Sequence, residues 1–298
     1  LDYPTRPIRW VVGYPPGGAT DIIARLIGQR LQEKLGQPFV IENKPGAGNN
    51  IATESVINAE PDGYTLLLVN PANYINTSLY QNLKFNVPRD VAPVASFNRV
   101  PNVMTVNKDV PAKTVAEFIE YVKANPGKVN LASSGNGTSV HLSGEMFMAM
   151  TGAKMTHVPY RGAAPALTDL IGGQVDSFFA PYTPLMGQIA GGKIRLLAVS
   201  SEKRIPSMPD VPTLREAGID VTMTQWYGLA APAGTPRDVV DTLTRAVAAA
   251  LRQPSLLQVY RKDGAQEATL SGDAFRDFIV RDIANYRAAA ERGNLKAE

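Results

Sequence analysis

The order of short apolar runs and amphipathic stretches restricts the fold of this chain most strongly. Apolar runs at 8–12, 39–42 and 65–69 predict buried strands. Between them, apolar residues at helical spacing predict helices over 20–35 and 51–58. Strands and helices that alternate in this way are typical of a parallel sheet with helices on both faces.

A second alternating series follows residues 71–100, which we expect to form irregular connections because they lack clear periodicity. Its predicted strands lie at 102–106, 130–132, 156–158, 175–179 and 194–199. Its predicted helices lie at 115–125, 139–150, 163–171 and 185–190. After a short strand at 228–231, the tail is predicted to be helical at 236–251, 255–263 and 271–291. The second series therefore predicts another α/β unit.

The two series divide the 298 residues into two lobes. The helical tail has little strand of its own, so we expect it to pack on the first unit. The predicted lobes are residues 1–100 with 228–298, and residues 101–227, with hinge crossings near 100 and 226. A hinge between two α/β lobes creates a cleft for a ligand.

The composition excludes several functions. The chain has no cysteine, which rules out thiolate catalysis, disulfides and Cys-based metal sites. The net charge of +3 is too small to indicate binding to nucleic acid or to an anionic membrane. No apolar run approaches the roughly 18 residues of a membrane span. We predict no cofactor and no metal.

Three loops between a strand and a helix are candidate ligand sites, because ligands of open α/β sheets bind beyond the carboxyl ends of strands. The first loop contributes the candidates Tyr14, Gly17, Gly18, Ala19, Thr20 and Asp21. Its glycines and the free N–H groups of the next helix favour an anion, although a plain strand-to-helix turn has the same composition.

The second loop contributes Ser134, Gly137, Thr138 and Ser139. It lacks the Lys-Ser/Thr ending of a phosphate loop and the third glycine of the dinucleotide pattern, so its donors suit a carboxylate. A polar helix cap is the alternative.

The third loop contributes Tyr160, Arg161, Gly162 and Ala163. Arg161 is equally consistent with a pairing to a ligand carboxylate and with a solvated surface charge. Tyr160 either lies against the ligand or braces the hinge.

Weaker candidates lie elsewhere. Asn70 and Asn73 follow the third strand and offer hydrogen bonds to a ligand or to a turn. Trp226 and Tyr227 lie at the second crossing, as a cleft wall or as hinge packing. We expect His141 to be a structural hydrogen-bonding residue. His157 lies within a predicted strand, where burial is expected.

Motifs spread over nearly the whole chain resemble the extracytoplasmic receptors of the tripartite tricarboxylate transporter family, often called Bug proteins. The matching stretches are Tyr3-Pro4 to Pro7-Ile8, Pro15-Pro16-Gly17-Gly18, Asn43-Lys44-Pro45-Gly46-Ala47-Gly48, Pro61-Asp62-Gly63-Tyr64-Thr65-Leu66, Ser133-Ser134-Gly135-Asn136-Gly137-Thr138, His157-Val158-Pro159-Tyr160, and Gly228 to Pro236.

The resemblance implies a type II periplasmic-binding-protein fold with a Venus-flytrap cleft. It also implies that the closed, loaded receptor is delivered to a membrane permease of one large and one small subunit. We expect a monomer in the periplasm whose ligand is a small organic carboxylate. In such receptors, backbone groups and waters of the loop matching 17–21 hold one carboxylate, and the loop matching 134–139 closes from the other lobe. The start at Leu1 fits a removed export signal, although an artificial start would leave the same residue.

One departure from the family pattern concerns the ligand. Relatives often have Asp and Asn after the strand that we predict at 175–179, whereas this chain has Ala180, Pro181 and Tyr182. The exchange favours a dicarboxylate or an aromatic acid over an amino acid.

Two other functions compete with transport. A ligand-loaded sensor for a signalling partner has the same sequence features. A hydrolase using Ser134 or Ser139 with His141 is disfavoured, because residues two apart on a helix face different sides and no Gly-x-Ser-x-Gly elbow occurs. We therefore predict that the protein is not an enzyme.

Overall fold

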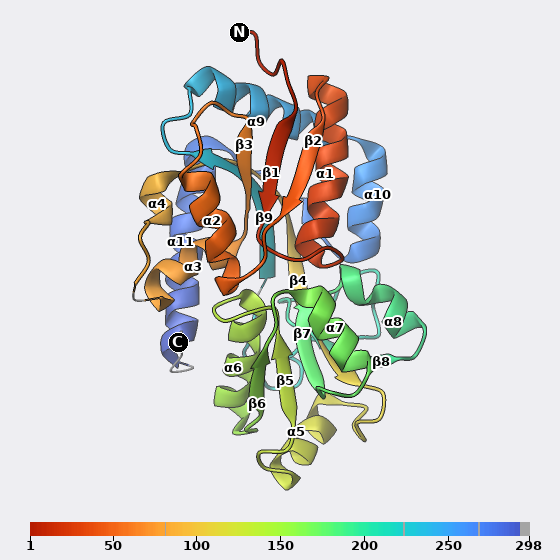
Figure 1. Ribbon diagram of the computed structural model, residues 1–298. Helices are drawn as coiled ribbons and strands as arrows, with labels where there is room; N and C mark the ends of the chain where they lie inside the picture. Colours follow the sequence, from red (N-terminus) through yellow and green to blue (C-terminus); the bar gives the residue numbers. More distant parts are fainter. Residues whose placement is uncertain (81, 223, 268, 293–298) are drawn as a thin grey trace.

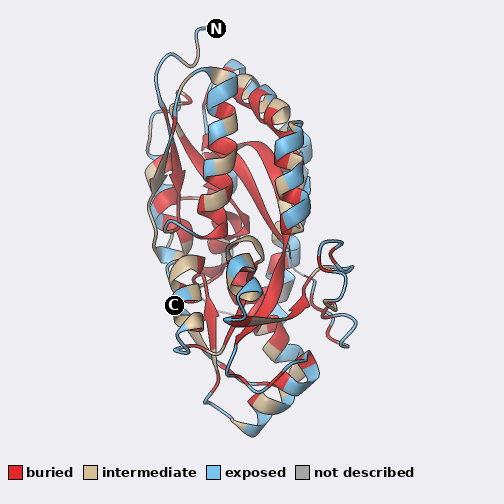
Figure 2. Cartoon of the chain, turned by 90° about the vertical axis from the view of Figure 1, so that its right-hand side faces the viewer, coloured by how far each residue is buried: buried red, intermediate tan, exposed pale blue. Residues whose placement is uncertain are grey.

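A computed structural model describes residues 1–298 apart from 81, 223, 268 and 293–298. The chain forms two α/β lobes stacked end to end, with the first residues at the far end of the first lobe (Figure 1). Buried positions concentrate on the strands and on the inner sides of the helices, as Figure 2 shows. No helix in the described part of the chain is both long and apolar enough to span a bilayer.

The first lobe contains a sheet in the order β2-β1-β3-β9-β4. Its strands are β1 (Ile8–Val12), β2 (Phe39–Asn43), β3 (Thr65–Val69), β9 (Thr224–Pro232), β10 (Gln266–Glu267) and the first part of β4 (Val91–Asn107). β1 pairs in parallel with β2 and β3, while β9 runs antiparallel to β3. The predicted parallel core is therefore confirmed.

Helices cover both faces of this sheet, because its strands are apolar on both sides. Trp10 packs into one hydrophobic cluster and its neighbour Val11 into another on the opposite face. The helices that complete the lobe are α1 (Ala19–Leu35), η1 (Ala47–Asn49), α2 (Asn50–Ile57), α3 (Pro71–Leu79), α4 (Val87–Asp90), α9 (Arg237–Leu251) and α10 (Pro254–Asp263).

The second lobe has its own hydrophobic clusters around a second sheet. Its strands are β5 (Asn130–Ser133), β6 (Thr156–Pro159), β7 (Ser177–Pro181), β8 (Ile194–Val199) and the last part of β4. Its helices are α5 (Val115–Ala124), α6 (Ser139–Thr151), α7 (Ala163–Ile171), η2 (Thr183–Leu185) and α8 (Met186–Ala190).

The prediction that residues 71–100 are irregular is wrong. Asn70 caps α3 by accepting from the Ala72 amide at 3.1 Å, and Pro71 begins the helix. β4 then runs for 17 residues through both lobes. Its residues 91–101 pair with β9, and residues 102–107 pair with β7 and β8. Prolines and two bulges along β4 mask the alternation that identifies a strand.

The last helix, α11 (Gly272–Arg292), packs on both lobes. Phe275 belongs to a cluster of the first lobe, whereas Tyr286 belongs to a cluster of the second. Tyr286 also donates a hydrogen bond to the Thr224 carbonyl at 2.7 Å. This arrangement differs from the expectation that the whole tail packs on the first lobe, because the helix is long enough to reach past the crossing strands.

Candidate functional site

The N-termini of α1 and α7 face each other across the two lobes. Gly18 and Gly162 precede these helices, and neither N-terminus has a side-chain cap. A Cβ atom on Gly18 would lie 3.7 Å from the Ala163 amide nitrogen. Among the described residues, no acceptor is found for the amides of Ala19, Thr20 or Ala163. Uncapped amides and two helix dipoles that meet at one point favour an anion there.

Asp21 does not weaken this positive potential, because its carboxylate is engaged within its own lobe. It accepts hydrogen bonds from the Gly17 amide at 3.1 Å, from Arg25 and from Asn43. Arg25 also forms an ion pair with it. The acid therefore fixes the loop and is neutralised beside it.

The second predicted loop is held mainly by its own hydrogen bonds. Thr138 caps α6 by accepting from the His141 amide at 3.2 Å, and it donates to the Gly135 carbonyl at 2.8 Å. The Gly137 amide donates to His141 Nδ1 at 3.1 Å. The Ser134 hydroxyl, in contrast, has no partner within the described residues and borders a cavity. Ser134 is therefore the hydroxyl of this loop most available to a ligand.

Ser139 connects this loop to the strands that cross between the lobes. Its hydroxyl donates to Gln225 in β9 and accepts from Asn102 Nδ2 in β4 at 3.3 Å. Sequence reasoning missed both partners, because a contact made over more than thirty residues of chain leaves no local pattern.

Asn70 and Tyr14 form the floor of the site. Asn70 Nδ2 donates to the Tyr14 hydroxyl at 3.1 Å, and burial raises the pKa of Tyr14 to about 12. Asn73 accepts from the Asn70 amide and donates to Thr53, so it completes the cap of α3. The Tyr14 hydroxyl therefore stays protonated, and Tyr14 and Asn70 are both neutral hydrogen-bonding groups.

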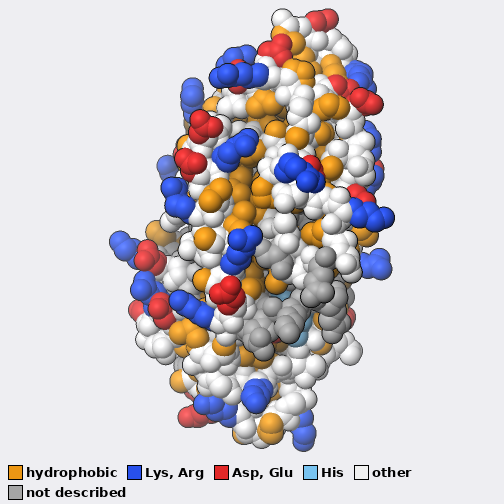
Figure 3. Space-filling view, turned by 90° about the vertical axis from the view of Figure 1, so that its left-hand side faces the viewer, with side chains coloured by type: hydrophobic (Ala, Val, Ile, Leu, Met, Phe, Trp, Pro, Cys, Tyr) orange, Lys and Arg blue, Asp and Glu red, His pale blue; other side chains and the backbone are white. Residues whose placement is uncertain are grey.

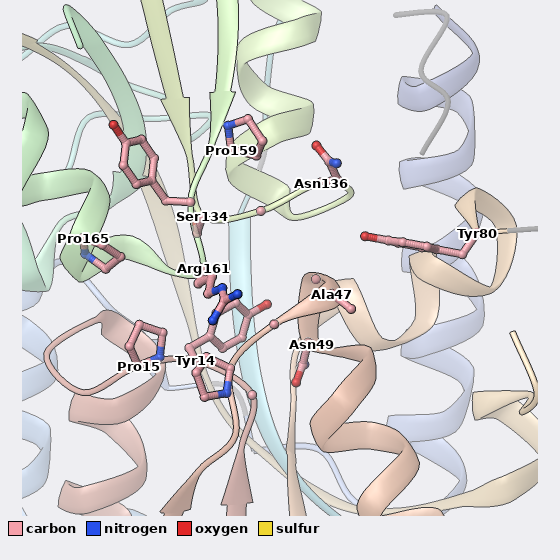
Figure 4. A pocket seen from close by; sticks show the side chains of 16 residues that line it. Tyr14, Pro15, Ala47, Asn49, Tyr80, Ser134, Asn136, Pro159, Arg161 and Pro165 are labelled. Carbon is pink, nitrogen blue, oxygen red and sulfur yellow. The ribbon is translucent and has the colours of Figure 1, made fainter. Parts of the chain in front are cut away.

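Two cavities lie at this junction. The smaller one has a volume of about 20 Å³ and is bordered by Tyr14, Ala19, Thr20, Asn70, Ser134, Thr138, Ser139, Val140, Ala163, Pro181, Gln225 and Tyr227. The larger one has a volume of about 540 Å³ and is bordered by Gly13, Tyr14, Pro15, Pro45, Gly46, Ala47, Gly48, Asn49, Tyr80, Ser134, Gly135, Asn136, Pro159, Tyr160, Arg161 and Pro165 (Figure 4). Nine of the predicted residues border the smaller cavity, and Tyr160 and Arg161 border the larger one. The predicted residues that border neither cavity are Gly17, Gly18, Asp21, Asn73, Gly137, Gly162 and Ala180.

Arg161 is the only charged residue on the wall of the larger cavity, and no ion pair involving it is found in the described part of the chain. Its neighbour Tyr160 donates a hydrogen bond to Asp169 at 2.6 Å. The larger cavity therefore offers one free positive charge.

Two predicted details change in the structure. β7 extends to Pro181, so Ala180 and Pro181 lie within the strand rather than after it. Of the two aromatic residues at the second crossing, Tyr227 borders the smaller cavity, while Trp226 packs away from it and donates to Asp282. β9 therefore presents these neighbours to opposite faces of the sheet.

The histidines lie behind the second loop. Their rings stack with centroids 3.9 Å apart, and Glu145 lies 3.3 Å from His141 Nε2. His141 Nδ1 accepts a hydrogen bond, so its proton lies on Nε2 and blocks the lone pair that a metal would need. His157 is half-buried rather than buried, and desolvation followed by the nearby His141 lowers its pKa to about 4.

Two α/β lobes that meet over a polar cavity, with helix N-termini aimed into it from both sides, define a two-lobed solute-binding protein. The chain belongs to the tripartite tricarboxylate transporter receptor family. The family model described as "Tripartite tricarboxylate transporter family receptor" matches residues 23–295. The family and the fold class predicted from the sequence are thus confirmed.

Relatives match over the full length. A "UPF0065 protein in tcbD-tcbE intergenic region" of Pseudomonas sp. strain P51 is 36% identical, covering 99% of this chain and 88% of that protein. Protein BugT of Bordetella pertussis is 33% identical, covering 99% and 91%. An R. palustris protein solved with adipate is 36% identical, covers 99% of both chains and has a TM-score of 0.96. MatC of Rhodopseudomonas palustris, solved with bound malate, is 32% identical, covers 96% and 99%, and has a TM-score of 0.90.

Proposed function

We propose that this protein captures a small organic carboxylate in the periplasm and delivers it to a two-subunit membrane permease, without chemical change. The observation that carries the proposal is the meeting of the uncapped α1 and α7 N-termini at Gly18 and Ala163. A carboxylate between them accepts hydrogen bonds from both lobes and so holds the lobes together.

The two cavities suggest how a dicarboxylate lies in the site. One carboxylate binds at the helix N-termini, with Thr20 and Ser134 beside it. The other extends into the larger cavity toward Arg161. No acidic residue borders either cavity within the described ranges, so nothing there offsets the charge of a ligand amino group. These surroundings favour a dicarboxylate or an aromatic acid over an amino acid.

The lobe arrangement supports a closed state. The TM-score is 0.96 to the relative solved with adipate, but 0.67 to a Polaromonas solute-binding protein of the same family that was solved without ligand, at 34% identity and 97% coverage of this chain. The moving units are residues 1–100 with 228–298 and residues 101–227, turning about crossings near 100 and 226. Each hydrogen bond to the ligand charge contributes about 1.5–3 kcal/mol, so a few suffice for roughly micromolar affinity.

We further propose that the carrier is monomeric and has no role in nucleic-acid binding. Figure 3 shows basic and acidic side chains interspersed over one face of the molecule. The candidate hydrolase groups are engaged elsewhere, because His141 Nδ1 accepts the Gly137 amide and the Ser139 hydroxyl donates to Gln225. Among the described residues, neither cavity wall presents a nucleophile–base pair that would support catalysis.

Calorimetric titration with succinate, adipate, terephthalate, aspartate and glutamate tests the proposal. We expect one of the first three to bind most tightly and to be recovered unchanged. Tight binding of an amino acid, with no binding of the other acids, would contradict the proposal that the ligand is a dicarboxylate or an aromatic acid. A thermal-shift screen in which no organic acid raises the melting temperature would remove the receptor function.

A further inference from the structure

The only two histidines of the sequence lie together behind the second predicted loop. His141 belongs to α6 and His157 to β6, and the planes of their stacked rings differ by 7°. Neither histidine borders the smaller or the larger cavity. An effect of these rings on a ligand therefore passes through the loop that separates them from the cavities.

Each ring supports one glycine amide of that loop through a nitrogen that accepts a hydrogen bond. His141 Nδ1 accepts directly from the Gly137 amide at 3.1 Å. The Gly135 amide donates to the Ser133 hydroxyl oxygen at 3.2 Å, and His157 Nε2 lies 2.6 Å from that oxygen. Ser133 is fully buried, and within the described residues His157 Nε2 is the acceptor in reach of its hydroxyl proton. Both rings therefore fit the loop in their neutral form.

A proton added to either ring converts an acceptor that faces the loop into a donor. On His141 Nδ1 the new N–H would oppose the N–H of Gly137, and on His157 Nε2 it would leave the buried Ser133 hydroxyl without an acceptor. Desolvation, followed by the nearby His141, lowers the pKa of His157 to about 4, which agrees with a preference for the neutral ring.

The charged group beside the rings is Glu145, whose carboxylate lies 3.3 Å from His141 Nε2 and also acts on His157. A proton on either histidine would be offset by this carboxylate, so it would add little attraction for an anionic ligand in the cavities. The broken hydrogen bonds of the loop are therefore the larger effect of acid on binding.

From this geometry we infer that the two histidines form a proton-sensitive support of the second predicted loop, so that acid loosens the loop and weakens the hold on the carboxylate. The inference rests on the proposed function and adds a means of regulation to it. Ser134, which borders both cavities, lies between Ser133 and Gly135 in the chain. The residues that the rings support are thus the immediate neighbours of the hydroxyl that faces the ligand.

Calorimetry at pH 7.5 and pH 4.5 tests the inference with the acid that binds most tightly among those proposed. The original protein is compared with the double variant His141→Asn, His157→Gln, whose amide oxygens replace Nδ1 and Nε2 as acceptors but do not titrate. Between the two pH values, we expect the original protein to lose at least about fivefold more affinity than the double variant, the effect of one lost hydrogen bond. Protonation of the ligand affects both proteins equally and cancels in this comparison.

Nuclear magnetic resonance of the original protein gives a second measurement, which decides even if the double variant fails to fold. Because the chain has two histidines, the ring signal lost in each single variant assigns both. Saturation with ligand should move the titration midpoint of His157 to lower pH, since binding and protonation oppose each other.

Two outcomes overturn the inference while binding at pH 7.5 still upholds the receptor function. One is a His157 midpoint that stays unchanged or rises when ligand is added. The other is an equal loss of affinity in acid for the original protein and a folded double variant. Absence of binding to every proposed acid at pH 7.5 overturns both the inference and the proposed function.

Discussion

Gly162 of the second lobe lies directly against Pro15 of the first: a Cβ atom at position 162 would stand 2.5 Å from Pro15 Cδ. Gly162 belongs to the third predicted ligand loop and Pro15 lies within the first, so these two loops meet in space although nearly 150 residues of chain separate them. Contact at this point brings the α7 N-terminus onto the α1 N-terminus.

Gly162→Ala should therefore obstruct closure. We expect the affinity for the ligand to fall at least about tenfold, because the lobes no longer deliver both sets of amides to one carboxylate. The melting temperature without ligand should fall modestly, since Gly162 has a φ of 157°, which alanine rarely adopts. Gly173→Ala, at an exposed position of positive φ just after α7, lacks the contact with Pro15 and is the matched control. Unchanged affinity in Gly162→Ala would show that this contact is not needed for binding.

Arg161→Gln should weaken dicarboxylates selectively. The loss of a charge-assisted hydrogen bond corresponds to about 1.5–3 kcal/mol, or roughly ten- to a hundredfold in affinity. A monocarboxylate of the same length should bind equally well to both proteins. Calorimetry with both ligand types, with Arg252→Gln on the surface as control, measures the difference. Equal losses for mono- and dicarboxylates would place Arg161 outside direct contact with the second carboxylate.

Thr138→Val should lower both stability and affinity. The substitution removes the cap of α6 and one of the two hydrogen bonds that the Gly135 carbonyl accepts from residue 138, at a cost of about 1 kcal/mol. Thr114→Val removes a similar cap from α5, which lies at the far end of the same lobe. Chemical denaturation should show comparable losses in both variants, while only Thr138→Val should weaken the ligand. Equal ligand affinities of the original protein and Thr138→Val would show that binding does not require the hydrogen bonds that Thr138 makes within the second loop.

The pKa of His157, lowered to about 4, predicts a stability that declines in acid. The folded protein favours the neutral ring, whereas the unfolded chain takes up a proton below a pH of about 6.5. The contribution of this residue is therefore complete above that pH and is lost as the pH falls toward 4. His157→Gln should flatten the pH profile of the unfolding free energy. A profile with the same slope in both proteins contradicts the prediction.

Asp282 should have the opposite effect on the pH dependence of stability. Burial raises its pKa to about 6, although the hydrogen bond from Trp226 partly opposes this effect. The folded state then holds a proton that the unfolded chain releases above about pH 4, so stability falls as the pH rises from about 4 to 6. Asp282→Asn should remove this fall and raise the stability at pH 7 by about 1–3 kcal/mol. Chemical denaturation of both proteins at pH 4 and pH 7 measures the difference. A variant that is less stable than the original protein at pH 7 would contradict the raised pKa of Asp282.

The sequence by itself determined the parallel core of the first lobe and the helices that start at its loops. Helix α7 and strand β8 match their predicted limits, because local periodicity and terminal glycines act over a few residues. The same local patterns identified the loops rich in glycine and hydroxyl groups that meet between the lobes.

Only the tertiary structure decided which of these groups are free. Thr138 and Asp21 have suitable chemistry for a ligand but engage their own loops, whereas Gln225 enters the site from a segment with no ligand-binding pattern. The long strand β4 was also hidden, since its hydrogen bonds go to β9 and β7, far away along the chain. Pairing and burial depend on distant residues, so a local pattern does not contain them.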